Sequence, residues 1–244
     1  MADKYEPVDG QKLESDYCEA IKDKKLISYA DVRCKRCGTC CKGQFPFLGL
    51  TLSDVYELSR GLHLTMIETI VKYCSISLYA PGNLYMFAID MEKGCPFYSD
   101  KEGCTIHGFK PESCRAFPFM EYNVTYFGDS SWYDRMPDCA YLLMDRDAII
   151  RYDIETLVDN HLWTYITDAF IFNNTSMDEG KIKNFYMKAR QVVADEEVRA
   201  IARNLIETQI KLNTIHRYAH KSVALHPDRY KLLLEKMAYY LPVS

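Results

Sequence analysis

The chain has 244 residues, 48% of them hydrophobic and 26% charged, which are ordinary values for a globular protein with a substantial core. A net charge of −4, with no basic run longer than Lys24-Lys25, argues against nucleic-acid binding. No apolar stretch approaches the roughly 20 residues that span a bilayer, and the polar N-terminus lacks the pattern of a signal peptide. We therefore expect a cytosolic protein that binds neither nucleic acid nor membrane.

The first half of the chain is expected to contain short elements separated by turns. The predicted elements are helices over 16–27, 51–60 and 65–74, a hairpin within 76–91 and a strand over 124–132. Thr51 with Asp54, and Thr65 with Glu68, have the spacing of capping boxes, and Gly61 is expected to end the first of these two helices. Residues 34–50 and 94–118 are rich in turn residues and are expected to form loops.

The second half is expected to be helical. Helices are predicted over 145–158, 160–172, 178–193, 195–217 and 227–240. Ser176 with Glu179 is a further capping box, and Pro227 suits a first helical turn. One buried stripe is expected on the fourth helix, formed by Ile201, Leu205, Ile206, Ile210 and Ile215. No glycine-rich nucleotide loop and no serine nucleophile elbow occurs.

We predict an α+β fold in which a loop-rich, metal-organised N-terminal half with short helices and a small hairpin precedes an all-helical C-terminal region. The expected divisions are a polar and helical lead-in over 1–33, a cysteine-cluster domain over 34–142 and a helical region over 143–244.

Cysteines are the most informative residues of the chain. It has ten, four of them within eight residues, and the last hundred residues have none. In a reducing cytosol such a density indicates metal or redox chemistry rather than disulfides. The eight candidate metal ligands are Cys34, Cys37, Cys40, Cys41, Cys95, Cys104, Cys114 and Cys139.

The spacing of these cysteines leaves the metal open. Cys34, Cys37 and Cys40 have the C-x2-C-x2-C spacing of bacterial ferredoxins, which favours an iron–sulfur cluster, with one or two [4Fe–4S] clusters expected. Structural zinc sites more often pair two C-x2-C hooks, so zinc remains the alternative. Adjacent side chains usually diverge, so we expect Cys40 and Cys41 not to share one ion. Eight ligands would suffice for two four-thiolate sites.

Other residues near the cysteines have two interpretations. Lys35, Arg36, Lys42 and Arg115 would lower thiol pKa values and compensate an anionic cluster, or they are solvated loop charges. Cys18 and Cys74 lie outside the cluster on predicted helices, where a buried cysteine acts as a small hydrophobe. His216 and His220 would share a helix face, which we interpret as surface placement rather than as a metal pair.

Five motifs occur in the order typical of a known family. They are Cys34-x2-Cys37-Gly38-x-Cys40-Cys41, Leu50-Thr51-x2-Asp54, Gly94-Cys95-Pro96-Phe97, Gly103-Cys104-Thr105-Ile106-His107 and Lys110-Pro111-x2-Cys114-Arg115-x-Phe117-Pro118. In these motifs residues 34–140 resemble the YkgJ-type cysteine-cluster family, described as a proposed zinc- or iron-chelating domain. The resemblance implies that the matching cysteines are ligands, with Cys139 at a final, weaker motif position.

The chain departs from the family pattern at two positions. His107 stands where family members usually have tyrosine, and Lys110 replaces an arginine before the proline. We expect His107 to pack beside the site rather than to bind metal.

Three functions follow from these observations. The favoured one is an iron–sulfur protein that carries electrons, senses redox state or supports a partner enzyme. The alternatives are a zinc-stapled module that binds another protein, and a metal-dependent modifying enzyme, since flagellin lysine methylases carry a related cysteine cluster. A protein partner is expected in the first two cases, and the sequence leaves the oligomeric state open.

Overall fold

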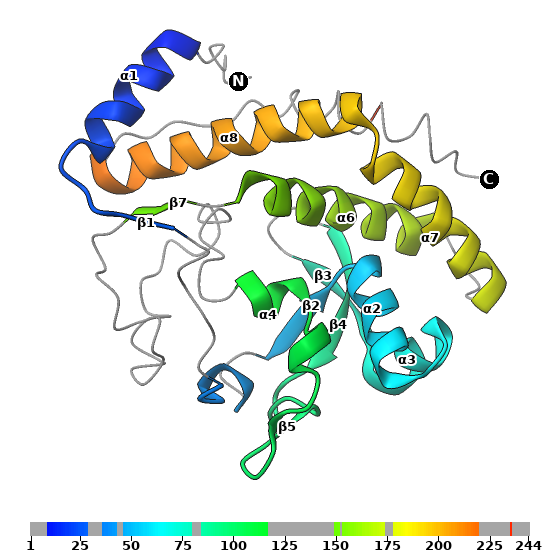
Figure 1. Ribbon diagram of the computed structural model, residues 1–244. Coiled ribbons are helices and arrows are strands. Elements are labelled where there is room, and N and C mark those ends of the chain that lie inside the picture. Colours follow the sequence, from blue (N-terminus) through cyan, green and yellow to red (C-terminus); the bar gives the residue numbers. More distant parts are fainter. Residues whose placement is uncertain are drawn as a thin grey trace, which may run out of the picture.

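The computed structural model describes residues 9–28, 36–42, 46–79, 84–116, 149–151, 153–173, 178–219 and 235 (Figure 1). The first half contains the elements α1 (Gly10–Ile21), β1 (Leu26–Ser28), η2 (Thr39–Cys41), β2 (Phe47–Leu50), α2 (Leu52–Leu62), α3 (Met66–Tyr73), β3 (Ser75–Tyr79), β4 (Leu84–Asp90), β5 (Tyr98–Ser99), β6 (Gly103–Cys104), η3 (His107–Phe109) and α4 (Glu112–Ala116). The second half contains β7 (Ile149–Arg151), α6 (Ile154–Asn173), α7 (Glu179–Val193) and α8 (Glu196–Ala219). The predicted α+β class is confirmed: short helices and a small antiparallel sheet precede a helical region.

The main sheet has three antiparallel strands in the order β2-β4-β3. Its register places Phe87 of β4 opposite both Leu50 of β2 and Ile76 of β3, so these three side chains share one face. Leu50 and Phe87 are fully buried, and the Phe87 ring lies 6.4 Å from that of Phe170 on α6. Helix α6 therefore covers this face at β2 and β4, whereas Ile76 on the edge strand β3 is half exposed.

Helix α6 lies between the sheet and α8, so the centre of the molecule is built in layers (Figure 1). A polar contact fixes α6 to the start of α2, because the Leu52 N–H donates to the Thr167 hydroxyl at 2.7 Å. On the other side of α6, Arg199 of α8 contacts Glu155 and Asp159, each at 2.5 Å. Helices α6 and α8 thus form a layer that holds the sheet and its short helices in place.

A stack of three aromatic rings joins the two halves of the chain. The rings of Tyr56 on α2 and Tyr186 on α7 lie 4.2 Å apart at an interplanar angle of 20°. The Trp163 ring of α6 also stacks with Tyr186, at 5.2 Å and 16°. Stacked rings add stabilisation to the apolar area that they bury, so α2 is held against both long helices.

The N-terminal elements pack against the C-terminal region. Helix α1 lies on α8, where Glu14 and Lys211 form an ion pair, and β1 pairs with β7 in parallel. The helix predicted over 16–27 begins earlier, because the Asp9 carboxylate caps it by accepting from Gln11 N–H at 2.9 Å. The end of that predicted helix is instead β1, which has its partner strand in the second half.

Two predicted starts of helices are confirmed and one predicted end is wrong. Thr51 and Thr65 form the capping boxes of α2 and α3. Gly61 does not end α2, which continues to Leu62 before His63 adopts a left-handed conformation. Gly61 instead allows the Phe109 ring to approach, since an added Cβ would lie 2.3 Å from that ring.

The helical region differs from prediction in its first part. The helix expected over 145–158 contains β7, and α6 is one helix where a break near 159 was expected. Asp178 caps α7, whereas Ser176 lies outside the described residues. On α8 the predicted stripe is confirmed, with Leu205, Ile206 and Ile215 buried.

Several expectations fall outside the described residues. They are the strand over 124–132, the helix over 227–240 with Pro227, the side chains of His216 and His220, and the domain boundary near 140–148. Among the helices that the structure describes, none is long and apolar enough to cross a membrane.

Candidate metal centre

Cys40 and Cys41 lie in a tight turn with their sulfur atoms close together. Gly38 begins the turn in a left-handed conformation, with φ of 77°, and its carbonyl accepts from Cys41 N–H at 2.8 Å. An added Cβ at Gly38 would lie 2.0 Å from the Tyr98 hydroxyl oxygen, so glycine is needed here for space and for conformation. The Cys40 and Cys41 Sγ atoms are 3.9 Å apart. The expectation that these side chains diverge is therefore wrong, because the short 3-10 turn points both thiols to one side.

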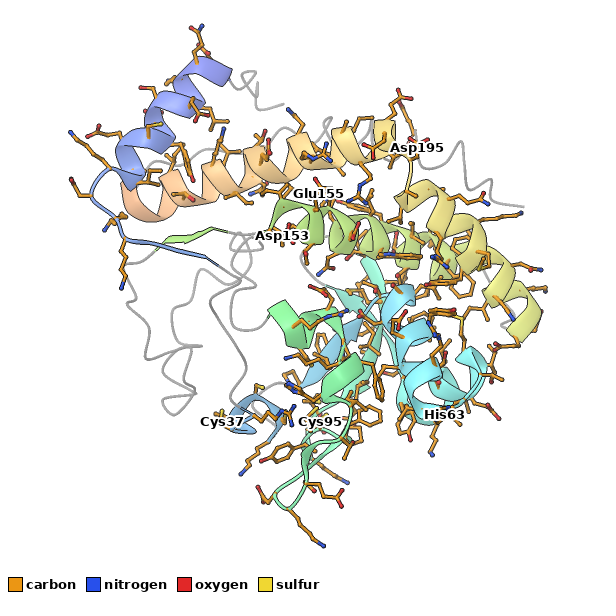
Figure 2. The ribbon with its side chains drawn as sticks, in the orientation of Figure 1. Cys37, His63, Cys95, Asp153, Glu155 and Asp195 are labelled. Carbon is orange, nitrogen blue, oxygen red and sulfur yellow. The ribbon has the colours of Figure 1, made fainter. Side chains whose placement is uncertain are left out.

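Cys95 is joined to this turn through the backbone. Its N–H donates to the Cys41 carbonyl at 2.7 Å. Gly94 makes the approach possible with a φ of 92°, and an added Cβ there would lie 3.3 Å from that carbonyl oxygen. Figure 2 shows Cys95 beside the turn that carries Cys37. Two motifs that are more than fifty residues apart in sequence thus form one structural unit.

Cys104 is carried by the small hairpin that follows Cys95. In this hairpin β5 pairs with β6 and Tyr98 lies opposite Cys104. The Tyr98 N–H donates to the Cys95 carbonyl at 3.1 Å, and Thr105 N–H donates to the Phe97 carbonyl at 2.9 Å. These bonds fix the direction in which the hairpin leaves Cys95, so Cys104 returns toward the same site.

Cys114 lies on the short helix α4, which packs against β2. Its N–H donates to the Pro111 carbonyl at 2.9 Å, in the first turn of α4. The Ser113 hydroxyl donates to the Gly49 carbonyl at 2.9 Å and so ties α4 to the sheet. Cys114 is thereby half-buried beside the other cysteines.

The thiols of Cys40, Cys41, Cys95 and Cys114 influence one another's pKa values. A hydrogen bond from Cys41 lowers the pKa of Cys40 and raises that of Cys41, and nearby Lys110 also favours the Cys40 thiolate. Burial raises the pKa of Cys95 and of Cys114, and a thiolate at Cys40 raises both further. Not all of these groups can ionise unless a cation lies among them. The donor set therefore fits a thiophilic metal ion, whose charge would reverse these pKa shifts.

The cations near the cysteines are used in different ways. Lys42 forms an ion pair with Asp100 at 2.7 Å, and Arg115 forms one with Glu112 at 2.8 Å. Lys110, for which no such role is expected from the sequence, lowers the pKa of both Cys40 and Cys114. The lysine before the proline is thus the cation with an electrostatic effect on two thiols.

The predicted ligands are not all placed. Cys34 and Cys139 lie outside the described residues. Cys37 is exposed, with its Sγ 3.4 Å from the Thr39 hydroxyl oxygen. Within the described parts of the chain, no group of three or more Cys, His, Asp or Glu side chains is arranged so that it could hold a metal ion. The assignment of these cysteines as ligands stays a prediction.

Three residues that are not among the predicted ligands lie on separate elements. Cys74 ends α3, and burial raises its pKa to about 12. Cys18 is on α1 but is exposed, so the expected burial of this residue is wrong. His107 lies on η3, where burial and the charges of Lys110 and Arg36 lower its pKa.

The comparison with protein families agrees with this geometry. Residues 33–140 match a CxxCxxCC family model. It is described as a proposed zinc- or iron-chelating domain. The match covers every cysteine predicted to bind metal, which supports a metal-binding protein, and the YkgJ-type name stays a prediction. No solved structure matches the chain.

Proposed function

We propose that this protein binds one or two metal ions through cysteine thiolates, and that these ions join the loops carrying Cys40, Cys41, Cys95, Cys104 and Cys114. These loops contain little regular structure, and a backbone hydrogen bond from Cys95 to Cys41 joins two of them from distant sequence positions. A metal ion that crosslinks such segments stabilises the folded state by its binding free energy. Cys34, Cys37 and Cys139 are the further ligands expected from the sequence.

The observation that carries the proposal is the 3.9 Å separation of the Cys40 and Cys41 sulfur atoms. Two thiolates bound tetrahedrally to one Zn²⁺, with Zn–S bonds of about 2.3 Å, lie about 3.8 Å apart. In a [4Fe–4S] cluster, by contrast, each cysteine binds its own iron. The pair therefore favours one shared ion, and a zinc-organised module over the [4Fe–4S] protein expected from the spacing.

An iron–sulfur protein is the second candidate. The C-x2-C-x2-C spacing of Cys34, Cys37 and Cys40 supports it, as does the positive charge of Lys110 beside the thiols. Because one iron of a [2Fe–2S] cluster binds two cysteines, that cluster is compatible with a shared Cys40–Cys41 pair. In this case the protein carries electrons or senses redox state.

Elemental analysis after anaerobic purification tests the proposal. We expect a colourless protein with about one or two zinc ions per chain, as structural sites with four thiolate ligands require. Iron with an equal amount of acid-labile sulfide, and visible absorption that dithionite bleaches, would instead establish the second candidate. A full-length, folded protein that contains neither metal and binds neither Zn²⁺ nor Fe²⁺ when titrated would contradict both.

A further inference from the structure

Asp54 is a buried carboxylate with two separate tasks. Its side chain has an exposed fraction of only 4%. Its Oδ2 atom accepts from the N–H of Thr51 at 2.8 Å and from the Thr51 hydroxyl at 2.9 Å. Its Oδ1 atom accepts from the N–H of Glu112 at 2.8 Å, from a residue 58 positions later. One oxygen thus caps α2, the helix to which Asp54 belongs, and the other binds the N–H of the first residue of α4.

A second capping box in the same chain shows that the first task does not require burial. Glu68 caps α3 as Asp54 caps α2, and its Oε2 atom accepts from Thr65 N–H at 2.8 Å and from the Thr65 hydroxyl at 3.0 Å. Glu68 is exposed, whereas Asp54 lies beneath α4. The bond to Glu112 is therefore an addition to the cap, and it is what distinguishes Asp54.

The bond to Glu112 reaches the residue that begins α4. This helix has five residues, so its own hydrogen bonds do little to fix where it starts or how it is turned. The Asp54 bond and the Ser113–Gly49 bond hold two successive residues of the first turn, and Cys114 is the next residue. A carboxylate acceptor makes the first bond charge-assisted and hence the stronger type.

We propose that Asp54 is a positioning residue for Cys114: by fixing the first turn of α4 against α2, it holds the Cys114 thiol at the metal centre. The role rests on the proposed function, because it gives Asp54 a task in metal binding. The Leu52–Thr167 bond extends the connection from the start of α2 to α6. Cys114 is thus connected through α4 and α2 to the long helix α6.

Two substitutions at Glu112 isolate the bond. Glu112→Ala removes the side chain and its ion pair with Arg115 but keeps the N–H that Asp54 accepts. Glu112→Pro also removes the N–H, at the first helical position where proline is well tolerated. The difference between these variants reports the loss of the Asp54–Glu112 bond together with the displacement of the Asp54 carboxylate by the proline Cδ atom, so both variants are compared with Asp54→Asn, which adds no bulk. Asp54→Asn is the second route, since it replaces one acceptor oxygen by an amide that cannot accept.

The first measurement is the rate of alkylation of Cys114 in the metal-free full-length protein, followed by mass spectrometry. We expect Glu112→Pro to react about tenfold faster than Glu112→Ala at Cys114, as the loss of a charge-assisted hydrogen bond implies. The rate at Cys74 on α3 is the internal reference and should not change. Equal Cys114 rates in the two variants, with Asp54→Asn matching wild type, would overturn the proposal.

The second measurement is the affinity for added Zn²⁺ in the same variants. We expect Glu112→Pro and Asp54→Asn to bind Zn²⁺ about tenfold more weakly than Glu112→Ala and wild type. Glu68→Gln weakens the equivalent cap of α3 and should leave Zn²⁺ affinity unchanged. An affinity loss as large in Glu68→Gln would mean that general destabilisation is responsible and would overturn the role of Asp54. If wild type binds no metal, the proposed function fails, and the alkylation rates still decide whether Asp54 positions Cys114.

Discussion

The helical layer (α6, α7 and α8) and the cysteine loops (residues 36–42 and 94–114) are stabilised in different ways. In the layer, apolar side chains such as Leu162, Ile166 and Ile182 are fully buried between long helices. Along 94–114 the buried apolar side chains are Phe97, Ile106 and Pro111, and the elements have two to five residues. Because the loops bury so few apolar side chains, the proposed metal ion would contribute more to their stability than to that of the layer.

Removing one ligand of the shared pair should have the largest effect. We expect Cys41→Ser to lose bound metal and with it on the order of 10 kcal/mol of the local stability of the cysteine loops, as for small zinc domains. Metal content by elemental analysis and thermal unfolding measure this. Cys18→Ser, at an exposed thiol of α1, is the matched control and should stay within about 0.5 kcal/mol of wild type. Full metal content in Cys41→Ser would contradict the shared ion.

A cavity in the helical layer should lower the stability of the protein without changing its metal content. Ile182 of α7 is fully buried, so Ile182→Ala should lower the free energy of unfolding by about 2–5 kcal/mol. The metal content should stay at the wild-type value, because Ile182 lies on α7 and none of the proposed ligands is on that helix. Met187→Ala, on the exposed side of the same helix, should have little effect. Denaturant unfolding with elemental analysis measures both, and loss of metal in folded Ile182→Ala would show that the two regions are not separable.

The stability of the layer should also depend on pH through His161. Burial lowers the pKa of this α6 histidine from 6.5 to about 4. Because the unfolded chain binds the proton at higher pH than the folded one, this contribution is complete above pH 6.5 and is lost as the pH falls to about 4. The loss should amount to about 3 kcal/mol. His161→Gln should remove this part of the pH dependence in denaturant unfolding. An unchanged profile in the variant would show that other groups are responsible.

The ion pairs on the surface of the helical layer should contribute least to the free energy of unfolding. Glu155 contacts both Arg199 and Arg203, which lower its pKa to about 2. This contribution is present above the ordinary glutamate pKa of 4.5 and is lost as the pH falls through about 2. Since Glu155 is half-exposed, Glu155→Gln should cost only about 1 kcal/mol at pH 7 and less at high salt. A larger cost that salt does not reduce would contradict an exposed pair.

Local signals are enough to predict much of the fold. Both capping boxes of α2 and α3 are read from residues three positions apart, and both helices begin where expected. The hairpin of β3 and β4 follows from two extended runs close in sequence. Strand β7 cannot be predicted in this way, because its partner β1 lies more than a hundred residues earlier. Three residues are too few to show a strand pattern without that partner, so 149–151 falls within the helix predicted over 145–158.

The candidate site shows the same limit. The cysteines can be identified from their spacing, but the close pair of Cys40 and Cys41 depends on the left-handed Gly38 and on Tyr98, which lies against it. The capping role of Asp54 can be predicted from Thr51, whereas its bond to Glu112 cannot, because 58 residues separate the two. A protein partner stays a prediction. Contacts between distant segments decide how the site is assembled, and single-sequence patterns do not contain them.

The most direct test of a metal-organised loop region is hydrogen exchange of the full-length protein with its metal and after chelation. We expect removal of the metal to reduce amide protection strongly in the cysteine loops, including Cys95 N–H and Glu112 N–H, while α6 and α8 keep theirs. Unchanged protection throughout the chain would show that no metal organises these loops. Loss of protection in the helical layer to the same extent would show that the whole molecule, and not the cysteine loops, depends on the metal.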